Sequence, residues 1–279
     1  MVTLLDSLLA WVKDATDVRV AAVFGSQARA LSGEDQPADP WSDVDLEIVT
    51  TRPGTYLNRA WTARIPGQTL HAYAVRPVFG KAQKVTAYFS GGEADFVIIP
   101  HRRLWLGKFA FNLGLHKRSP SIARGLGEFA LVMSFGHKIV KGGAGWANFY
   151  ERAVKELPLS HLTDGEAISL ADGAYVDAVS IMSKLGRGEF VAAQRWLHRS
   201  IIETNFRITH ELRARRGIVS YPDGRRVEQL LTSAELAGVR FEVKLAEESL
   251  RTATLVAVAA TRRLVTELTG RAPTWPEIG

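Results

Sequence analysis

The chain of 279 residues contains no cysteine. This absence excludes disulfide bonds, thiolate nucleophiles and metal sites built from cysteine ligands. The seven histidines are scattered and form no His-Glu-x-x-His pattern, so we expect no zinc site. The glycine-rich stretch at 141–146 lacks the Gly-Lys-Ser/Thr ending of a P-loop, and we interpret it as a turn.

The sequence also lacks a long apolar run. The most apolar stretch, 254–265, is interrupted by Arg262 and Arg263, well short of the roughly 20 residues that a membrane-spanning helix needs. Residues 1–17 have no basic segment, and their leucines recur with helical spacing, which indicates a helix and not a signal peptide. We therefore expect a soluble, cytoplasmic protein with no membrane partner.

The composition is that of a globular protein, with 46% hydrophobic and 23% charged residues. The net charge is +6, which is compatible with an anionic partner such as nucleic acid or a nucleoside triphosphate. A basic surface that only keeps the protein soluble is the simpler interpretation of this charge.

Apolar periodicity divides the chain into two parts. Residues 18–24, 42–50, 69–77, 83–90 and 94–100 have the β-branched or alternating patterns of strands. Beyond a basic, glycine-rich connection at 114–127 the spacing is helical, with long helices expected at 165–188, 189–217 and 242–270. We predict an α/β (α+β) domain with a mixed sheet at 1–118, followed by an all-α helical bundle at 119–279.

The predicted strand at 42–49 carries unusual charge, because Asp43, Asp45 and Glu47 alternate with apolar residues. Residues two apart on a strand point to the same side, about 6.5 to 7 Å apart. Carboxylates so placed repel each other unless a cation lies between them, and Mg²⁺ prefers oxygen ligands. An edge strand with one solvated face is the alternative. Glu47 lies too far along the strand to share a metal easily.

Two further features support a metal site. The stretch 24–29, Phe-Gly-Ser-Gln-Ala-Arg, takes a buried strand into a short helix, so that Gly25 and Ser26 can approach phosphate oxygens, with Arg29 one turn beyond. Asp95 lies in an otherwise apolar strand, where a charge requires a partner. If that strand lies beside 43–49, Asp95 reaches the same metal; a solvated strand end is the alternative.

Together these residues resemble the nucleotidyltransferase superfamily that includes DNA polymerase β: a hydrophobic strand ending in Gly25-Ser26, then Asp43 and Asp45 on the next strand, then Asp95 on a later one. Within it, the chain looks most like the antibiotic-modifying aminoglycoside 6-adenylyltransferase and lincosamide nucleotidyltransferase groups. The resemblance spreads over most of the chain and is sharp at 18–50 and 93–100.

The resemblance implies Mg²⁺-dependent transfer of a nucleoside monophosphate, usually from ATP, to a hydroxyl of a small molecule. Asp43 and Asp45 would hold Mg²⁺, and Gly25 and Ser26 would hold the terminal phosphates with help from Arg29. Asp95 would bind a second Mg²⁺, deprotonate the acceptor, or both.

Two departures bear on the acceptor. Sixteen residues separate Ser26 from Asp43, and Pro37 and Pro40 within them suggest an enlarged loop beside the site. The chain is basic, whereas enzymes that act on polycationic aminoglycosides tend to be acidic. A less cationic acceptor is therefore considered, and nucleic acid or protein acceptors, or a non-catalytic nucleotide-binding regulatory protein, stay as alternatives.

The helical half offers weaker candidates. Glu203 could hold the acceptor or act as the general base in place of Asp95, although an exposed or ion-paired glutamate is the simpler interpretation. Trp146, Tyr175 and Trp196 could stack on a sugar or base, but aromatic residues at helical spacing usually pack in a core.

Overall fold

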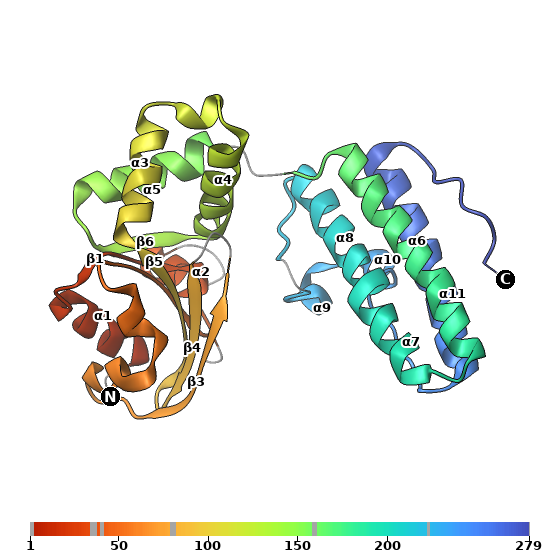
Figure 1. Ribbon diagram of the computed structural model, residues 1–279, viewed down its shortest axis with the longest axis horizontal. Coiled ribbons are helices and arrows are strands. Elements are labelled where there is room, and N and C mark those ends of the chain that lie inside the picture. Colours follow the sequence, from red (N-terminus) through yellow and green to blue (C-terminus); the bar gives the residue numbers. More distant parts are fainter. Residues whose placement is uncertain are drawn as a thin grey trace. The chain divides into compact units, whose positions relative to one another are not determined.

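The computed structural model describes residues 3–33, 38–39, 42–78, 82–157, 161–221 and 224–278. The chain divides into two units, Met1–Ser160 and His161–Gly279. The first unit has a mixed sheet with helices and the second is helical, which confirms the predicted fold class (Figure 1). Pro37 and Pro40 lie outside the described residues.

The first unit is built on one six-stranded sheet with the order β3-β4-β5-β2-β1-β6. Only the neighbours β2 and β5 pair in parallel, and the other neighbouring strands are antiparallel. The strands are β1 (Val18–Phe24), β2 (Val44–Thr50), β3 (Leu70–Pro77), β4 (Gln83–Phe89), β5 (Gly92–Pro100) and β6 (His137–Lys141). The first five agree with the sequence prediction to within two residues, whereas β6 was not predicted.

Helices cover both faces of this sheet (Figure 1). One core contains Leu8 and Trp11 of α1 and the inward side chains Leu46 and Ile48 of β2. The opposite core is formed mainly by α4 and α5 against the other side of the strands. The α-helices of this unit are α1 (Leu4–Asp14), α2 (Gly25–Ser32), α3 (His101–Asn112), α4 (Pro120–Ser134) and α5 (Ala144–Glu156), with short 3-10 turns η1 (Pro53–Leu57), η2 (Arg59–Arg64) and η4 (Leu115–Lys117).

The boundary between the units lies later than the expected division at 118/119. The stretch 114–127, expected to connect the domains, forms η4 and the first half of α4. The segment 119–157 stays with the first unit because β6 pairs with β1 and because α4 and α5 bury their apolar faces against the sheet. The glycine-rich 141–146 stretch is the end of β6, a short bend and the start of α5.

The second unit packs long helices around two apolar clusters. Thr163 begins α6 with a capping box that includes Glu166, and Gly270 ends α11 in the left-handed conformation. The helices are α6 (Asp164–Gly186), α7 (Phe190–Trp196), α8 (Glu203–Arg215), α9 (Val227–Leu230), α10 (Ser233–Leu236) and α11 (Glu247–Thr269). The helix expected at 189–217 is interrupted by a π-helical segment, η5 (Leu197–Ile202).

None of the described helices combines the length and apolar character that a bilayer span requires.

Candidate active site

Three carboxylates converge in the middle of the first unit's sheet. Asp43 directly precedes β2, Asp45 lies within it, and Asp95 lies opposite Asp45 in the parallel strand β5. One carboxylate oxygen from each residue lies within 4.8 Å of the others. The period of two turns Leu46 and Ile48 into the core with α1, which leaves Asp45 on the opposite face. The three residues form an all-oxygen donor set of the kind that Mg²⁺ prefers.

Asp95 is held tightly by the neighbouring strand β4. Its side chain is buried, the Nζ of Lys84 lies 2.5 Å from Oδ2, and the hydroxyl of Thr86 donates to Oδ1 at 2.6 Å. Lys84 therefore neutralises part of the charge that the three carboxylates concentrate. Sequence reasoning did not single out Lys84, because its relation to Asp95 depends on the pairing of β4 with β5.

Gly25 and Ser26 lie where β1 passes into α2. Gly25 has a φ of +70°, and a Cβ at this position would lie 2.8 Å from Oδ2 of Asp45. Its N–H donates to the carbonyl of Gly136 at 2.9 Å, and Ser26 is buried in the first turn of the helix. Only glycine lets the backbone approach Asp45 this closely. The loop predicted to bind phosphate therefore lies directly beside Asp45.

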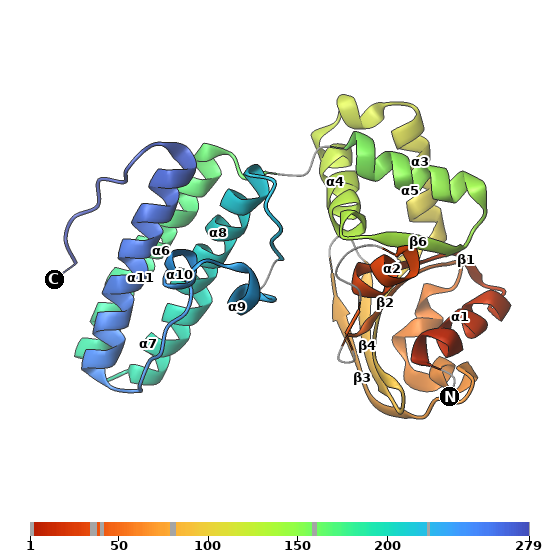
Figure 2. The same cartoon turned by 180° about the vertical axis from the view of Figure 1, so that it is seen from behind.

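Arg29 points to a structural contact. Its guanidinium donates to the carbonyl of Phe135, and its Cγ lies 2.8 Å from the point where a Cβ on Gly136 would fall. This interaction ties α2 to the turn before β6, and Figure 2 shows α2 beside that strand. The role expected for Arg29 as a helper of the triphosphate stays a prediction.

Glu47 is more deeply placed than the sequence suggested. The side chain is only 1% exposed, and the hydroxyl of the buried Tyr150 donates to its Oε1. Burial raises the pKa of Glu47 to about 7 against the lowering effect of the Tyr150 hydrogen bond, and burial likewise raises the pKa of Tyr150. In the sequence, Glu47 shares one face of the strand with Asp45 and with the apolar Val49. The apolar Val49 indicated that this face of the strand is covered by other residues.

A cavity of about 240 Å³ adjoins the carboxylates on this face. Asp45, Glu47, Lys84 and Asp95 contribute its polar wall. Its apolar walls come mainly from β5 and α4, with one residue from the end of β1 and one that follows β3: Val97, Ile99, Phe129, Val132, Met133, Phe24 and Val78. Small-molecule sites commonly combine an apolar cavity with a few converging polar groups of this kind.

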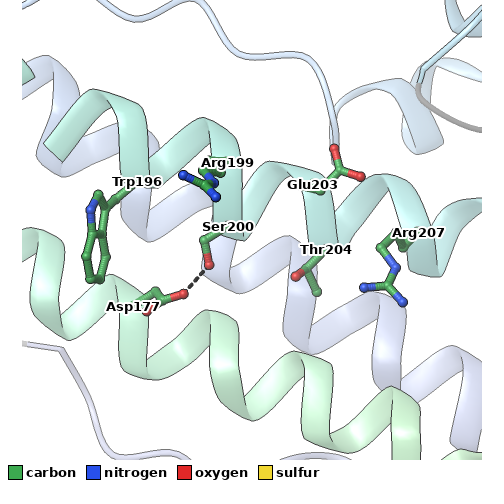
Figure 3. A pocket seen from close by; sticks show the side chains of 7 residues that line it. All are labelled: Asp177, Trp196, Arg199, Ser200, Glu203, Thr204 and Arg207. Atoms are coloured by element: carbon green, nitrogen blue, oxygen red, sulfur yellow. Dashed lines mark hydrogen bonds between the residues drawn. The ribbon is translucent and has the colours of Figure 1, made fainter. Parts of the chain in front are cut away.

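The second unit contains a separate polar groove of about 380 Å³ (Figure 3). It includes Trp196, Arg199, Glu203 and Arg207 along one helical run, and Asp177 of α6, which accepts a hydrogen bond from Ser200. The π-helical segment η5 carries Arg199 and Ser200. Such segments are frequent at functional sites because they widen the helix locally.

The other aromatic candidates are engaged in packing. Tyr175 stacks on Trp275, with ring centroids 5.1 Å apart. Trp146 packs in the first unit's core, with the Nζ of Lys108 4.3 Å from its ring centroid.

Two solved structures are similar to this chain. An aminoglycoside 6-adenyltransferase from Bacillus subtilis aligns over 96% of this chain and 89% of its own, with 10% identity and a TM-score of 0.37. A nucleotidyltransferase-like protein from Exiguobacterium sibiricum aligns over 94% of this chain and 73% of its own, with 13% identity and a TM-score of 0.35. No family model and no curated protein matches the chain. TM-scores this low support no assignment, so the function is argued from the site.

Proposed function

We propose that the protein is a metal-dependent nucleotidyltransferase that transfers a nucleoside monophosphate, AMP from ATP, to a hydroxyl group of a small molecule. The convergence of Asp43, Asp45 and Asp95 carries this proposal. Three carboxylates within 4.8 Å of one another are unfavourable without a cation, and the loop at Gly25 and Ser26 adds backbone and hydroxyl donors suited to phosphate beside them.

In the proposed reaction, the acceptor oxygen forms a bond to the α-phosphorus, and the bond from that phosphorus to the departing pyrophosphate breaks. Asp43 and Asp45 would hold Mg²⁺. Ser26 and the Gly25 backbone would orient the terminal phosphates, and the Gly25 N–H would exchange its hydrogen bond to the Gly136 carbonyl for one to phosphate. Bound Mg²⁺ would neutralise the charge of the triphosphate and of the leaving pyrophosphate. The residues of the site contribute mainly by positioning the reactants in line.

Asp95 would take the proton of the acceptor hydroxyl, hold a second Mg²⁺, or do both. Its contact with Lys84 bears on this choice, because Lys84 Nζ already lies 2.5 Å from Oδ2. A second cation at that oxygen requires the ammonium group to move away. The half-exposed Lys84 side chain can turn toward the phosphates, where its charge adds to that of the loop.

We propose that the groove of the helical unit binds a polar ligand. Glu203 supplies a carboxylate for hydroxyl or amino groups of that ligand, and Trp196 supplies an aromatic surface 39% exposed. Arg199 and Arg207 line the same groove, which suits a ligand less cationic than an aminoglycoside. Lincosamides and aminoglycosides are the antibiotic classes to test first.

The decisive test is transfer of labelled monophosphate from ATP, GTP, CTP and UTP to aminoglycosides, lincosamides and transfer RNA, with Mg²⁺ present. We expect transfer to one small-molecule class and its loss in Asp43→Asn. Transfer by Asp43→Asn at the wild-type rate contradicts the catalytic assignment.

The same panel separates the alternatives. Modification of transfer RNA, or of a protein added as acceptor, favours the macromolecular acceptor, and a salt-sensitive gel shift with oligonucleotides supports it independently. Calorimetry that detects Mg²⁺-dependent nucleotide binding without any transfer favours a regulatory protein, and absence of such binding contradicts the proposal.

A further inference from the structure

We propose that the cavity between β5 and α4 holds the base of the nucleotide, and that Glu47 recognises an amino group on the edge of that base. This inference rests on the proposed function, because it assumes that the triphosphate lies at Asp43, Asp45 and Asp95. It adds the place of the base and the residue that selects it.

The position of the cavity favours the nucleotide. Asp45 and Asp95 belong both to the carboxylate cluster and to the cavity wall, so a ligand that reaches the carboxylates with its phosphates has the cavity directly beside it. All the residues concerned belong to the first unit, which therefore builds the site by itself.

The size of the cavity favours one ring system. Pockets for drug-sized ligands measure about 300–1,000 Å³, whereas this cavity measures about 240 Å³. A multi-ring antibiotic or an entire nucleotide exceeds it. A flat base can lie between Val97 and Ile99 of β5 and the Phe129 and Met133 side chains of α4, with apolar contacts on both faces.

Glu47 gives the cavity a specific polar group. Its side chain is 1% exposed, and Tyr150 donates to Oε1. Glu47 lines the cavity and Tyr150 occupies Oε1, so Oε2 is the oxygen that a ligand in the cavity would meet. A carboxylate with so little access to water is stabilised by hydrogen-bond donors, so a ligand that donates to it gains affinity. The exocyclic amino groups of adenine and cytosine are such donors, whereas hypoxanthine and uracil carry a carbonyl at the same position.

The first experiment measures binding to the full chain by calorimetry at pH 8 with Mg²⁺, for ATP, ITP, CTP, UTP and inorganic tripolyphosphate. Tripolyphosphate probes the carboxylates and the phosphate loop without a base. We expect the nucleotide with the highest affinity to bind at least about tenfold more tightly than tripolyphosphate. Within the pair to which it belongs, the nucleotide with the amino group should bind about tenfold more tightly than the one with the carbonyl: ATP more tightly than ITP, or CTP more tightly than UTP.

Two variants assign these differences to the cavity. Val132→Phe places a larger side chain in the cavity wall and should weaken nucleotide binding at least about tenfold while tripolyphosphate binding stays unchanged. The matched control is Val75→Phe on β3, outside the cavity, which should change neither. In Glu47→Gln the oxygen that accepts from Tyr150 remains and an amide donor faces the base, so the preference within each pair should shift toward ITP or UTP.

The outcomes separate this inference from the proposed function. Failure of the wild type to bind both tripolyphosphate and nucleotides with Mg²⁺ contradicts the proposed function itself. If the wild type binds tripolyphosphate and the nucleotides with equal affinity, the inference alone is overturned. Unchanged nucleotide binding by Val132→Phe overturns it as well. If Val132→Phe also loses tripolyphosphate binding, the comparisons of ATP with ITP and of CTP with UTP decide. The inference is overturned if the wild type shows no preference within these pairs, or if Glu47→Gln shows the same preference as the wild type.

Discussion

Two buried polar residues, Asn205 of the helical unit and Glu47 of the first unit, differ in their surroundings. In the helical unit Asn205 donates to the carbonyls of Gly238 and Ala257 and accepts from the Thr261 hydroxyl, so its side chain is fully satisfied. In the first unit Glu47 accepts one hydrogen bond, from the Tyr150 hydroxyl, and lines a cavity beside three carboxylates that lie close together. A fully paired polar group stabilises the fold, whereas a polar group that lines a cavity can also bind a ligand. This contrast supports the proposal that the ligand binds in the first unit.

The largest expected effect comes from removing one carboxylate. Asp45→Asn should lower nucleotidyl transfer at least about 10³-fold, equivalent to about 4 kcal/mol of transition-state stabilisation, because the metal loses a charged ligand. In EDTA the same variant should unfold at a higher temperature than the wild type, because like-charge repulsion decreases. Transfer assays and thermal unfolding with and without Mg²⁺ measure both effects.

The control for this prediction is Asp14→Asn, which removes an exposed carboxylate at the end of α1. It should leave the transfer rate and the stabilisation by Mg²⁺ unchanged. An Asp45→Asn protein that is less stable than the wild type in EDTA would show that the Asp45 carboxylate gains more from its interactions in the folded protein than it loses by repulsion.

The helical unit should respond in the opposite way. Asn205→Ala removes the donor to the Gly238 carbonyl and opens a small void. It also removes one of the two side-chain partners of the Thr261 hydroxyl and the Ala257 carbonyl, which stay bonded to each other. The free energy of unfolding should fall by about 2 to 3 kcal/mol. Denaturant titration measures the loss. Binding of Mg²⁺ and tripolyphosphate should stay unchanged, and exposed Asn148→Ala on α5 is the control with no expected effect.

The strands around the site were predictable because their apolar alternation is local. The same alternation placed Asp43 and Asp45 on one face, and the apolar surroundings of Asp95 indicated a partnered charge. The roles of these residues, and of Gly25, Ser26 and Arg29, stay predictions that the experiments above test.

Other features depend on contacts between distant segments. The short β6 has no sequence pattern of its own beyond five residues, and its pairing with β1 moves the boundary of the first unit to 160. Lys84 meets Asp95 only through the register of β4 and β5, and Glu47 meets Tyr150 across 103 residues. Short-range sequence patterns do not predict such contacts between distant residues.

A pH-dependent loss of stability is expected from Glu47. Its pKa of about 7 in the folded protein exceeds the usual 4.5, so the folded state holds the proton more tightly than the unfolded chain does. The contribution to stability is therefore present below pH 4.5, falls as the pH rises through 7 and levels off above it, a change of about 3 kcal/mol. Glu47→Gln lacks this change, so its stability relative to the wild type should increase from pH 4.5 to pH 8.

Chemical denaturation in EDTA across this pH range checks the prediction. Glu151→Gln, an exposed neighbour of Tyr150 on α5, should follow the wild-type curve. Parallel curves for Glu47→Gln and the wild type would mean that the Glu47 carboxyl is as well solvated in the folded protein as in the unfolded chain.

The smallest effect separates close approach from backbone strain. It compares Gly25, the first residue of α2, with Gly33, the C-cap of the same helix, because both have a φ of +70°. A Cβ at Gly33 meets nothing within 4 Å, so Gly33→Ala should cost only the left-handed strain, about 1 kcal/mol. A Cβ at Gly25 falls 2.8 Å from Asp45 Oδ2, so Gly25→Ala carries the same strain and also displaces a carboxylate of the site. Gly25→Ala should lower the free energy of unfolding by about 2 kcal/mol. Tripolyphosphate binding should weaken in Gly25→Ala and stay unchanged in Gly33→Ala. Equal effects of the two substitutions on binding would mean that the approach of Gly25 to Asp45 has no part in holding phosphate.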